Sequence, residues 1–133
     1  MFDLINQLIG INHLVISIIF LIPIFFIILC KDNLFLKRLL LFLLIVNSFT
    51  FYMILFITNS FDYRIHLPLH LCYITELAIL ISLLFNTKAV YPWLVLNSML
   101  GGLVGFINSN LPLGSSLIEY LHFYLSHFNL LLF

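Results

Sequence analysis

The chain of 133 residues is 64% hydrophobic and only 8% charged, with a mean hydropathy of +1.24. These charges are too few to cover the surface of a soluble domain of this size, and a formal net charge of zero gives no basis for nucleic-acid binding. The composition therefore indicates an all-α, polytopic membrane protein whose single domain covers residues 1–133 and whose surroundings are membrane lipids.

Several apolar stretches are long enough to form transmembrane helices, because about 17–25 residues cross the hydrocarbon core of a bilayer. In chain order, the expected spans are 11–30, 39–58, 69–85, 92–107 and 117–133. The linker at 108–116 is rich in Asn, Ser, Pro and Gly, which favour turns. The last span stops without a polar anchor, so two interpretations stay open: a complete protein, and a fragment of a longer bundle.

The cationic residues predict how the spans cross the membrane. Only Arg64 lies between the second and third spans, whereas the other four lie after the first and third spans, at Lys31, Lys37, Arg38 and Lys88. Because Lys and Arg favour the cytoplasmic side, we expect a multi-pass protein of the cell membrane with its N-terminus outside. Cys30 and Cys72 would then lie at opposite faces of the membrane and could not form a disulfide.

The fourth span contains a closely spaced group of glycines. Gly101 and Gly105 are four residues apart, as are Ser98 and Gly102. Small residues at this spacing let two helices approach closely. The pattern predicts helix packing, within the bundle or against a partner subunit through Gly101 and Gly105.

Polar groups concentrate at the start of the third span, in the stretch HLPLHLCYITELAIL at 66–80. Cys72 and Glu76 are four residues apart and share one face of a helix. A carboxylate inside a membrane costs roughly 2.5–3.5 kcal/mol on insertion scales, so Glu76 is a functional candidate by default. The alternative is a structural hydrogen bond between helices, to Asn47 or Asn97.

The fifth span contains histidines that could be catalytic partners of Cys72. A histidine next to a cysteine can deprotonate the thiol, which is the requirement for nucleophilic catalysis. His122 and His127 differ by about 140° around a helix, so they cannot both point at one spot. His127 lies roughly 15 Å into the span, whereas Cys72 lies about one turn deep, so depth alone favours His122.

A metal site is the other interpretation of the third-span stretch. His66, His70 and Cys72 are ligand types that zinc accepts. Pro68 interrupts the helix that would align the two histidines, and the sequence has no second dense cluster of His and Cys. We therefore expect neither a metal nor a cofactor.

Three segments resemble a known family in their order and spacing. LPLHLC at 67–72, GGLVGFINSNL at 101–111 and FYLSH at 123–127 are similar to the YwaF-like family of integral membrane proteins, which includes transmembrane protein 164. The resemblance implies a multi-span helical bundle that transfers fatty acyl groups on phospholipids through a cysteine. It implies that Cys72 is the nucleophile, His127 its partner and His70 a motif neighbour.

The leading hypothesis is therefore a thiol-dependent acyltransferase acting on phospholipid acyl chains. Tyr73 or Asn108 would stabilise the oxyanion that forms when the thiol attacks an ester. Glu76 would orient the histidine of the fifth span, and His122 is the alternative partner of Cys72. The rival hypothesis, from another class, is a non-enzymatic membrane module: a small transporter component or a substrate-binding subunit.

Overall fold

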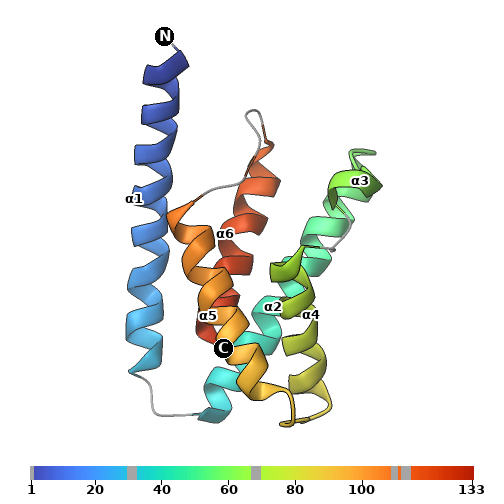
Figure 1. Ribbon diagram of the computed structural model, residues 1–133. Helices are drawn as coiled ribbons and strands as arrows, with labels where there is room; N and C mark the ends of the chain where they lie inside the picture. Colours follow the sequence, from blue (N-terminus) through green and yellow to red (C-terminus); the bar gives the residue numbers. More distant parts are fainter. Residues whose placement is uncertain (1, 30–32, 67–69, 109–110, 112–114) are drawn as a thin grey trace.

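The computed structural model describes residues 2–29, 33–66, 70–108, 111 and 115–133, and these residues form helices without strands. Pro68, Lys31 and Cys30 lie outside the described residues. The all-α prediction is confirmed for the described part of the chain. Its helices are α1 (Phe2–Ile28), α2 (Asn33–Ile57), the one-turn α3 (Tyr63–His66), α4 (Leu71–Leu84), α5 (Tyr91–Ile107) and α6 (Leu117–Leu132) (Figure 1).

The boundaries of α4, α5 and α6 agree with the expected spans to within two residues, whereas the first two helices begin earlier than expected. The chain enters α1 at Phe2 rather than at 11, and α2 at Asn33 rather than at 39. Hydropathy marks only the apolar part of a helix. Lys37 and Arg38 are good helix formers, so they extend α2 beyond its apolar part without interrupting it.

Helix α6 is the centre of the bundle. It packs against α1, α2, α4 and α5, and Figure 1 shows it between the other helices. Half of its residues are buried, namely His122, Phe123, Tyr124, Ser126, His127, Phe128, Asn129 and Leu130. A capping box formed by Ser116 and Glu119 fixes its start. Any functional group on α6 is therefore held by neighbours on several sides.

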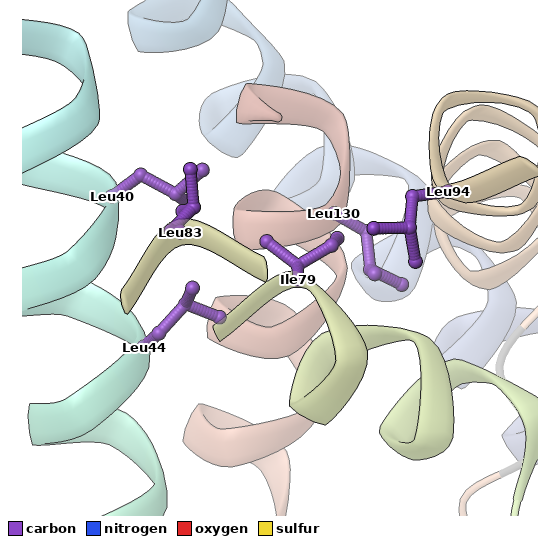
Figure 2. Close-up of a cluster of buried hydrophobic side chains, with 6 residues drawn as sticks. All are labelled: Leu40, Leu44, Ile79, Leu83, Leu94 and Leu130. Atoms are coloured by element: carbon purple, nitrogen blue, oxygen red, sulfur yellow. The ribbon is translucent and has the colours of Figure 1, made fainter. Parts of the chain in front are cut away.

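Two apolar clusters hold the bundle together. One joins α2, α4, α5 and α6 and converges on Ile79 (Figure 2), with Leu40, Leu44, Leu83, Leu94 and Leu130 around it. The other joins α1 and α5 to α6, through Ile24, Phe106, Phe123, Tyr124 and Phe128. A hydrogen bond of 2.6 Å between His13 Nδ1 and the Tyr124 hydroxyl also ties α1 to α6.

The outer surface is also apolar. Phe25, Phe49 and Phe85 are each at least 65% exposed. Among the described helices, one is clearly long and apolar enough to cross a membrane: Leu34–Ile57, with a mean hydropathy of 2.4. Only 28% of its most apolar window is buried by the rest of the protein. Shorter apolar segments occupy His13–Ile27, Leu71–Leu84 and Tyr91–Ile107.

Successive long helices run in opposite directions. In Figure 1 the end of α1, the start of α2 and the turn from α4 to α5 lie at the bottom, whereas the end of α2, α3 and the start of α6 lie at the top. A hydrogen bond of 3.3 Å from Lys37 Nζ to Asn86 Oδ1 links α2 to the α4–α5 turn at the lower end. Lys37 and Lys88 therefore lie at the same end of the bundle.

Candidate functional site

A cavity of about 390 Å³ brings most of the candidate residues together. Its walls come mainly from the start of α4 and from α6. The lining residues are Phe51, His66, His70, Leu71, Cys72, Tyr73, Leu111, Glu119, His122, Phe123 and His127. Cys72, His127, His70, Tyr73 and His122 thus share one site, whereas Glu76 and Asn108 do not line it.

The different starting levels of α4 and α6 explain how Cys72 and His127 reach the same cavity. Figure 1 shows that α4 begins well below the start of α6. Cys72 is the second residue of α4, and His127 is the eleventh residue of α6. The lower start of α4 offsets the greater number of residues before His127. The depth argument from sequence assumed that both helices begin at one level, and that assumption was wrong.

The glycines of α5 form one wall beside these two residues. A Cβ atom added at Gly101 would lie 3.2 Å from Cys72 Sγ, and one added at Gly105 would overlap the imidazole of His127. Gly101 and Gly105 are one turn apart, which is about 6 Å along α5. The thiol and the imidazole therefore lie on successive turns of the same helix face. Packing against a partner subunit through these glycines stays a prediction.

A hydrogen bond fixes which nitrogen of His127 can accept a proton. Nδ1 lies 2.7 Å from the carbonyl oxygen of Phe123, in the preceding turn of α6. A carbonyl oxygen can only accept, so Nδ1 carries the hydrogen and donates it. In the neutral ring, Nε2 is then the basic nitrogen. It lies on the side of the ring near Gly105.

His122 is held differently. Its ring stacks on Phe51, with centroids 3.7 Å apart and planes 4° apart, and on Tyr73 at 5.3 Å. Its Nδ1 lies 3.1 Å from Asn47 Oδ1, while Asn47 Nδ2 donates to Ser126 Oγ at 2.9 Å. Because the amide nitrogen of Asn47 is used on Ser126, the amide oxygen accepts from His122 Nδ1. His122 of α6 is thus held in place by side chains of α2 and α4.

Glu76 belongs to a buried polar network rather than to the Cys72 cavity. Asn129 Nδ2 donates to Glu76 Oε1 at 3.1 Å, and Ser126 and Asn47 also interact with the carboxylate. Of the two partners that the sequence suggested, Asn47 is therefore present. Asn97 donates to the Trp93 carbonyl of its own helix. Glu76 instead lines a smaller cavity of about 130 Å³, together with Leu44, Ser48, Tyr52, Tyr73, Leu77, Leu80 and His122.

The remaining candidates lie at the edges of the site. His70 is exposed and precedes the first turn of α4, with its ring 6.0 Å from that of Tyr73. Asn108 is exposed at the C-terminal cap of α5. Tyr73 lines both cavities. Of the two residues suggested for the oxyanion, only Tyr73 borders the cavity that holds Cys72.

Sequence reasoning missed a polar contact at the mouth of the cavity. His66 Nδ1 accepts from the Asp62 backbone N–H at 2.9 Å, so its Nε2 carries the hydrogen that faces Glu119 Oε1 at 3.4 Å. This contact joins α3 to α6. The spacing Ser116-x-x-Glu119 is a capping-box signal that could have placed Glu119 at the helix start. Nothing in the sequence indicated its pairing with His66.

The chain was compared with protein families, with curated proteins and with solved structures. The model of the TMEM164 family matches residues 8–133. The chain belongs to the TMEM164 family. No curated protein and no solved structure matches it.

Membership of the TMEM164 family confirms the resemblance carried by the three motifs. The match extends well beyond those motifs, since it includes most of α1 and the whole of α2. It also supports the general prediction of a membrane protein, which agrees with the apolar outer surface. Among the described residues, no group of three His, Cys, Asp or Glu side chains is arranged to hold a metal ion.

Proposed function

We propose that this member of the TMEM164 family is a membrane-embedded acyltransferase in which Cys72 carries the acyl group of a phospholipid as a thioester. One observation carries the proposal: Cys72 Sγ and the His127 ring lie beside glycines one turn apart on α5 and line the same cavity. A reactive thiol requires a base within reach. His127 supports the proposal as that base, because its Nδ1–H is used on Phe123 and Nε2 is then free to accept a proton.

In the first half-reaction, Cys72 Sγ attacks the ester carbonyl carbon of a phospholipid. The thiol proton moves to His127 Nε2 as the carbon–sulfur bond forms. The ester carbon–oxygen bond then breaks, and the leaving alkoxide takes the proton from His127. The products are an acyl-Cys72 thioester and a lysophospholipid with a free hydroxyl.

The second half-reaction reverses these roles with another hydroxyl. The acceptor oxygen attacks the thioester carbon, and the carbon–sulfur bond breaks. The hydroxyl proton passes to His127 Nε2 and from there to the departing sulfur. Both steps form an oxyanion, and a positioned hydrogen-bond donor is worth about 10²–10³-fold in rate. We assign this role to Tyr73, because it lines the same cavity. The roles of His70 and Asn108 stay predictions.

The proposal includes a multi-pass arrangement in the cell membrane. The alternating directions of α1, α2, α4, α5 and α6 support five membrane-embedded helices. Helix α4 is short, since its 14 residues rise about 21 Å. The position of Lys37 and Lys88 at one end supports a cytoplasmic assignment for that end and an outside N-terminus. The Cys72 cavity is lined in part by His66 of α3 and Glu119 near the start of α6, and Figure 1 shows these two elements at the opposite end of the bundle.

The thioester is the direct test. The purified chain in nanodiscs of mixed phospholipids should gain the mass of one acyl group, and hydroxylamine should remove it. Cys72→Ala should abolish the gain, whereas Cys30→Ala, which keeps the proposed nucleophile, should retain it. An unmodified mass together with unchanged lipid composition over hours would contradict the enzyme and favour the non-enzymatic binding module.

A further inference from the structure

The outer face of α5 carries an amide that the bundle does not enclose. Asn97 is the seventh residue of α5, so it lies about 9 Å from the start of the helix. Its side chain is partly exposed, whereas Asn47 and Asn129 are buried between helices. In the membrane-embedded arrangement proposed above, this amide meets the hydrocarbon region, where a polar group without a partner is costly.

Asn97 uses only part of its capacity for hydrogen bonds. Its Nδ2 donates one hydrogen to the carbonyl oxygen of Trp93 at 2.8 Å. A side-chain amide has two hydrogens on its nitrogen and an acceptor oxygen. Within the described part of the chain, no group pairs with the second hydrogen or with Oδ1. Lipid chains cannot supply these partners, whereas a polar side chain on a neighbouring membrane helix can.

The residues around Asn97 form a seam of the kind found in parallel coiled coils. Four residues spaced by four, three and four positions fall within about 60° around α5, namely Trp93, Asn97, Leu100 and Val104. Trp93 is 48% exposed, and Leu100 and Val104 are each 57% exposed. In this spacing Asn97 occupies an a position of the heptad. We call these four residues the Asn97 seam.

The Asn97 seam is turned away from the rest of the bundle. The glycines Gly101 and Gly105 lie on another face of α5, against Cys72 and His127. Figure 1 shows α5 in front of α6, on which it packs. The glycine face is therefore filled by the chain's own helices, and the seam is left facing outward.

We propose that two copies of this chain pair through the Asn97 seam, with the two Asn97 amides hydrogen-bonded to each other across a two-fold axis. A second copy fits because an amide, which donates and accepts, is complementary to itself. The membrane gives both copies one orientation, so the two α5 helices run parallel and identical residues meet at the same depth. In parallel pairs, Asn at a single a position fixes the register and the number of helices.

The dimer leaves each copy's proposed site intact, because Cys72 and His127 lie beside the glycine face of α5 rather than the seam. The inference rests on the membrane-embedded arrangement that belongs to the proposed function, but not on the thioester chemistry. The acyl-transfer reaction and the pairing of two copies can therefore fail separately.

The first test measures pairing in a bilayer. The full chain, labelled once at its N-terminus, is placed in liposomes at several protein-to-lipid ratios, and single-molecule photobleaching counts the copies in each complex. Both monomers and dimers should appear, with dimers favoured at higher ratios by mass action. Asn97→Leu should weaken the dimer at least about threefold, as the loss of one hydrogen bond between membrane helices predicts.

Two variants control this measurement. Asn97→Gln keeps an amide and should restore most of the pairing. Thr50→Leu removes an exposed polar side chain from α2, outside the seam, and should pair like the unsubstituted chain.

The second test identifies the face that pairs. In a chain in which both native cysteines are replaced by alanine, Leu100→Cys places a thiol in the seam. Met99→Cys places one on the adjacent residue, which is exposed to nearly the same extent but points about 100° away. Oxidation by copper phenanthroline in air should join two Leu100→Cys chains by a disulfide and leave Met99→Cys chains mostly single.

A chain that stays monomeric at every ratio would overturn the inference, and so would equal pairing of the Asn97→Leu and unsubstituted chains. Equal cross-linking of Leu100→Cys and Met99→Cys would also overturn it, as would cross-linking of Leu100→Cys to a different membrane protein in cells. A dimer whose chains form no thioester would keep this inference and reject the acyltransferase. A thioester on a chain that never pairs would do the reverse.

Discussion

At the scale of single residues, the glycines of α5 have different neighbours although they look equivalent in the sequence. Their spacing predicted close helix packing, and the structure agrees with that expectation. The spacing could not show, however, that Gly101 lies beside the thiol of Cys72 and Gly105 beside the imidazole of His127. The sequence specifies the small residue, but the rotation and level of α4 and α6 decide which side chain fills the space.

A methyl group should therefore act differently at the two positions. At Gly105 it would overlap the His127 ring, which must move. A displacement of about 1 Å near reacting groups can cost about 100-fold in rate, and we expect Gly105→Ala to slow thioester formation by that order. At Gly101 the closest atom is Cys72 Sγ at 3.2 Å, so a shift of a few tenths of an ångström suffices and the loss in rate should be smaller than at Gly105.

The measurement is the rate of acyl mass gain in nanodiscs, with thermal unfolding of each variant recorded alongside. Unfolding at similar temperatures would separate a displaced His127 from a damaged bundle. Thioester formation at the unsubstituted rate in Gly105→Ala would contradict the role given to His127.

At the scale of helices, the sequence predicted the boundaries of α4, α5 and α6 closely, but it predicted only some of the partners of Glu76. Turn-forming residues mark the ends of α5 and the start of α6, so those boundaries follow from local chemistry. The partner of Glu76 depends on how each helix is rotated. Because the helices are apolar on nearly all sides, their sequences do not determine how each one is rotated about its axis. Asn47 was an expected partner of Glu76, but Asn129 was not, because its place in the bundle depends on α6 being central.

The hydrogen bond from Asn129 to Glu76 should contribute measurably to the packing of α4 on α6. Hydrogen bonds between helices in membranes are worth about 0.6 kcal/mol on average and about 1.7 kcal/mol at most. We expect Asn129→Ala to lower the free energy of unfolding by an amount in this range, measured by SDS unfolding in mixed micelles. Asn97→Ala is the control, because Asn97 bonds within its own helix, and its effect should stay within about 0.5 kcal/mol. Equal effects of the two variants would contradict a stabilising α4–α6 contact.

At the scale of the whole molecule, an apolar exterior surrounds a core that contains several polar side chains. Glu76, His122, His127 and Asn129 are all buried, while Phe25 and many other large apolar side chains are exposed. In water this distribution would be unfavourable, but in a bilayer the apolar exterior contacts lipid and polar groups are best satisfied inside the bundle. Composition alone predicted this class of protein. It could not place the two cavities, which depend on where the helices meet.

The orientation that we propose rests on the charges of the loops, and it can be tested at two exposed loop positions. Ser60 follows α2 at the upper end of the bundle, and Thr87 lies in the α4–α5 turn beside Lys88. In a chain in which both native cysteines are replaced by alanine, Ser60→Cys should react with a membrane-impermeant maleimide in intact cells. Thr87→Cys should react only after the membrane is permeabilised, because the positive-inside rule places the lysine-bearing end in the cytoplasm.

Labelling of Thr87→Cys but not Ser60→Cys in intact cells would reverse the orientation, and labelling of both would contradict a membrane-spanning bundle. If the orientation holds, the mouth of the cavity at His66 and Glu119 faces the outer leaflet, and the proposed acyl donor and acceptor must come from the lipids of that leaflet.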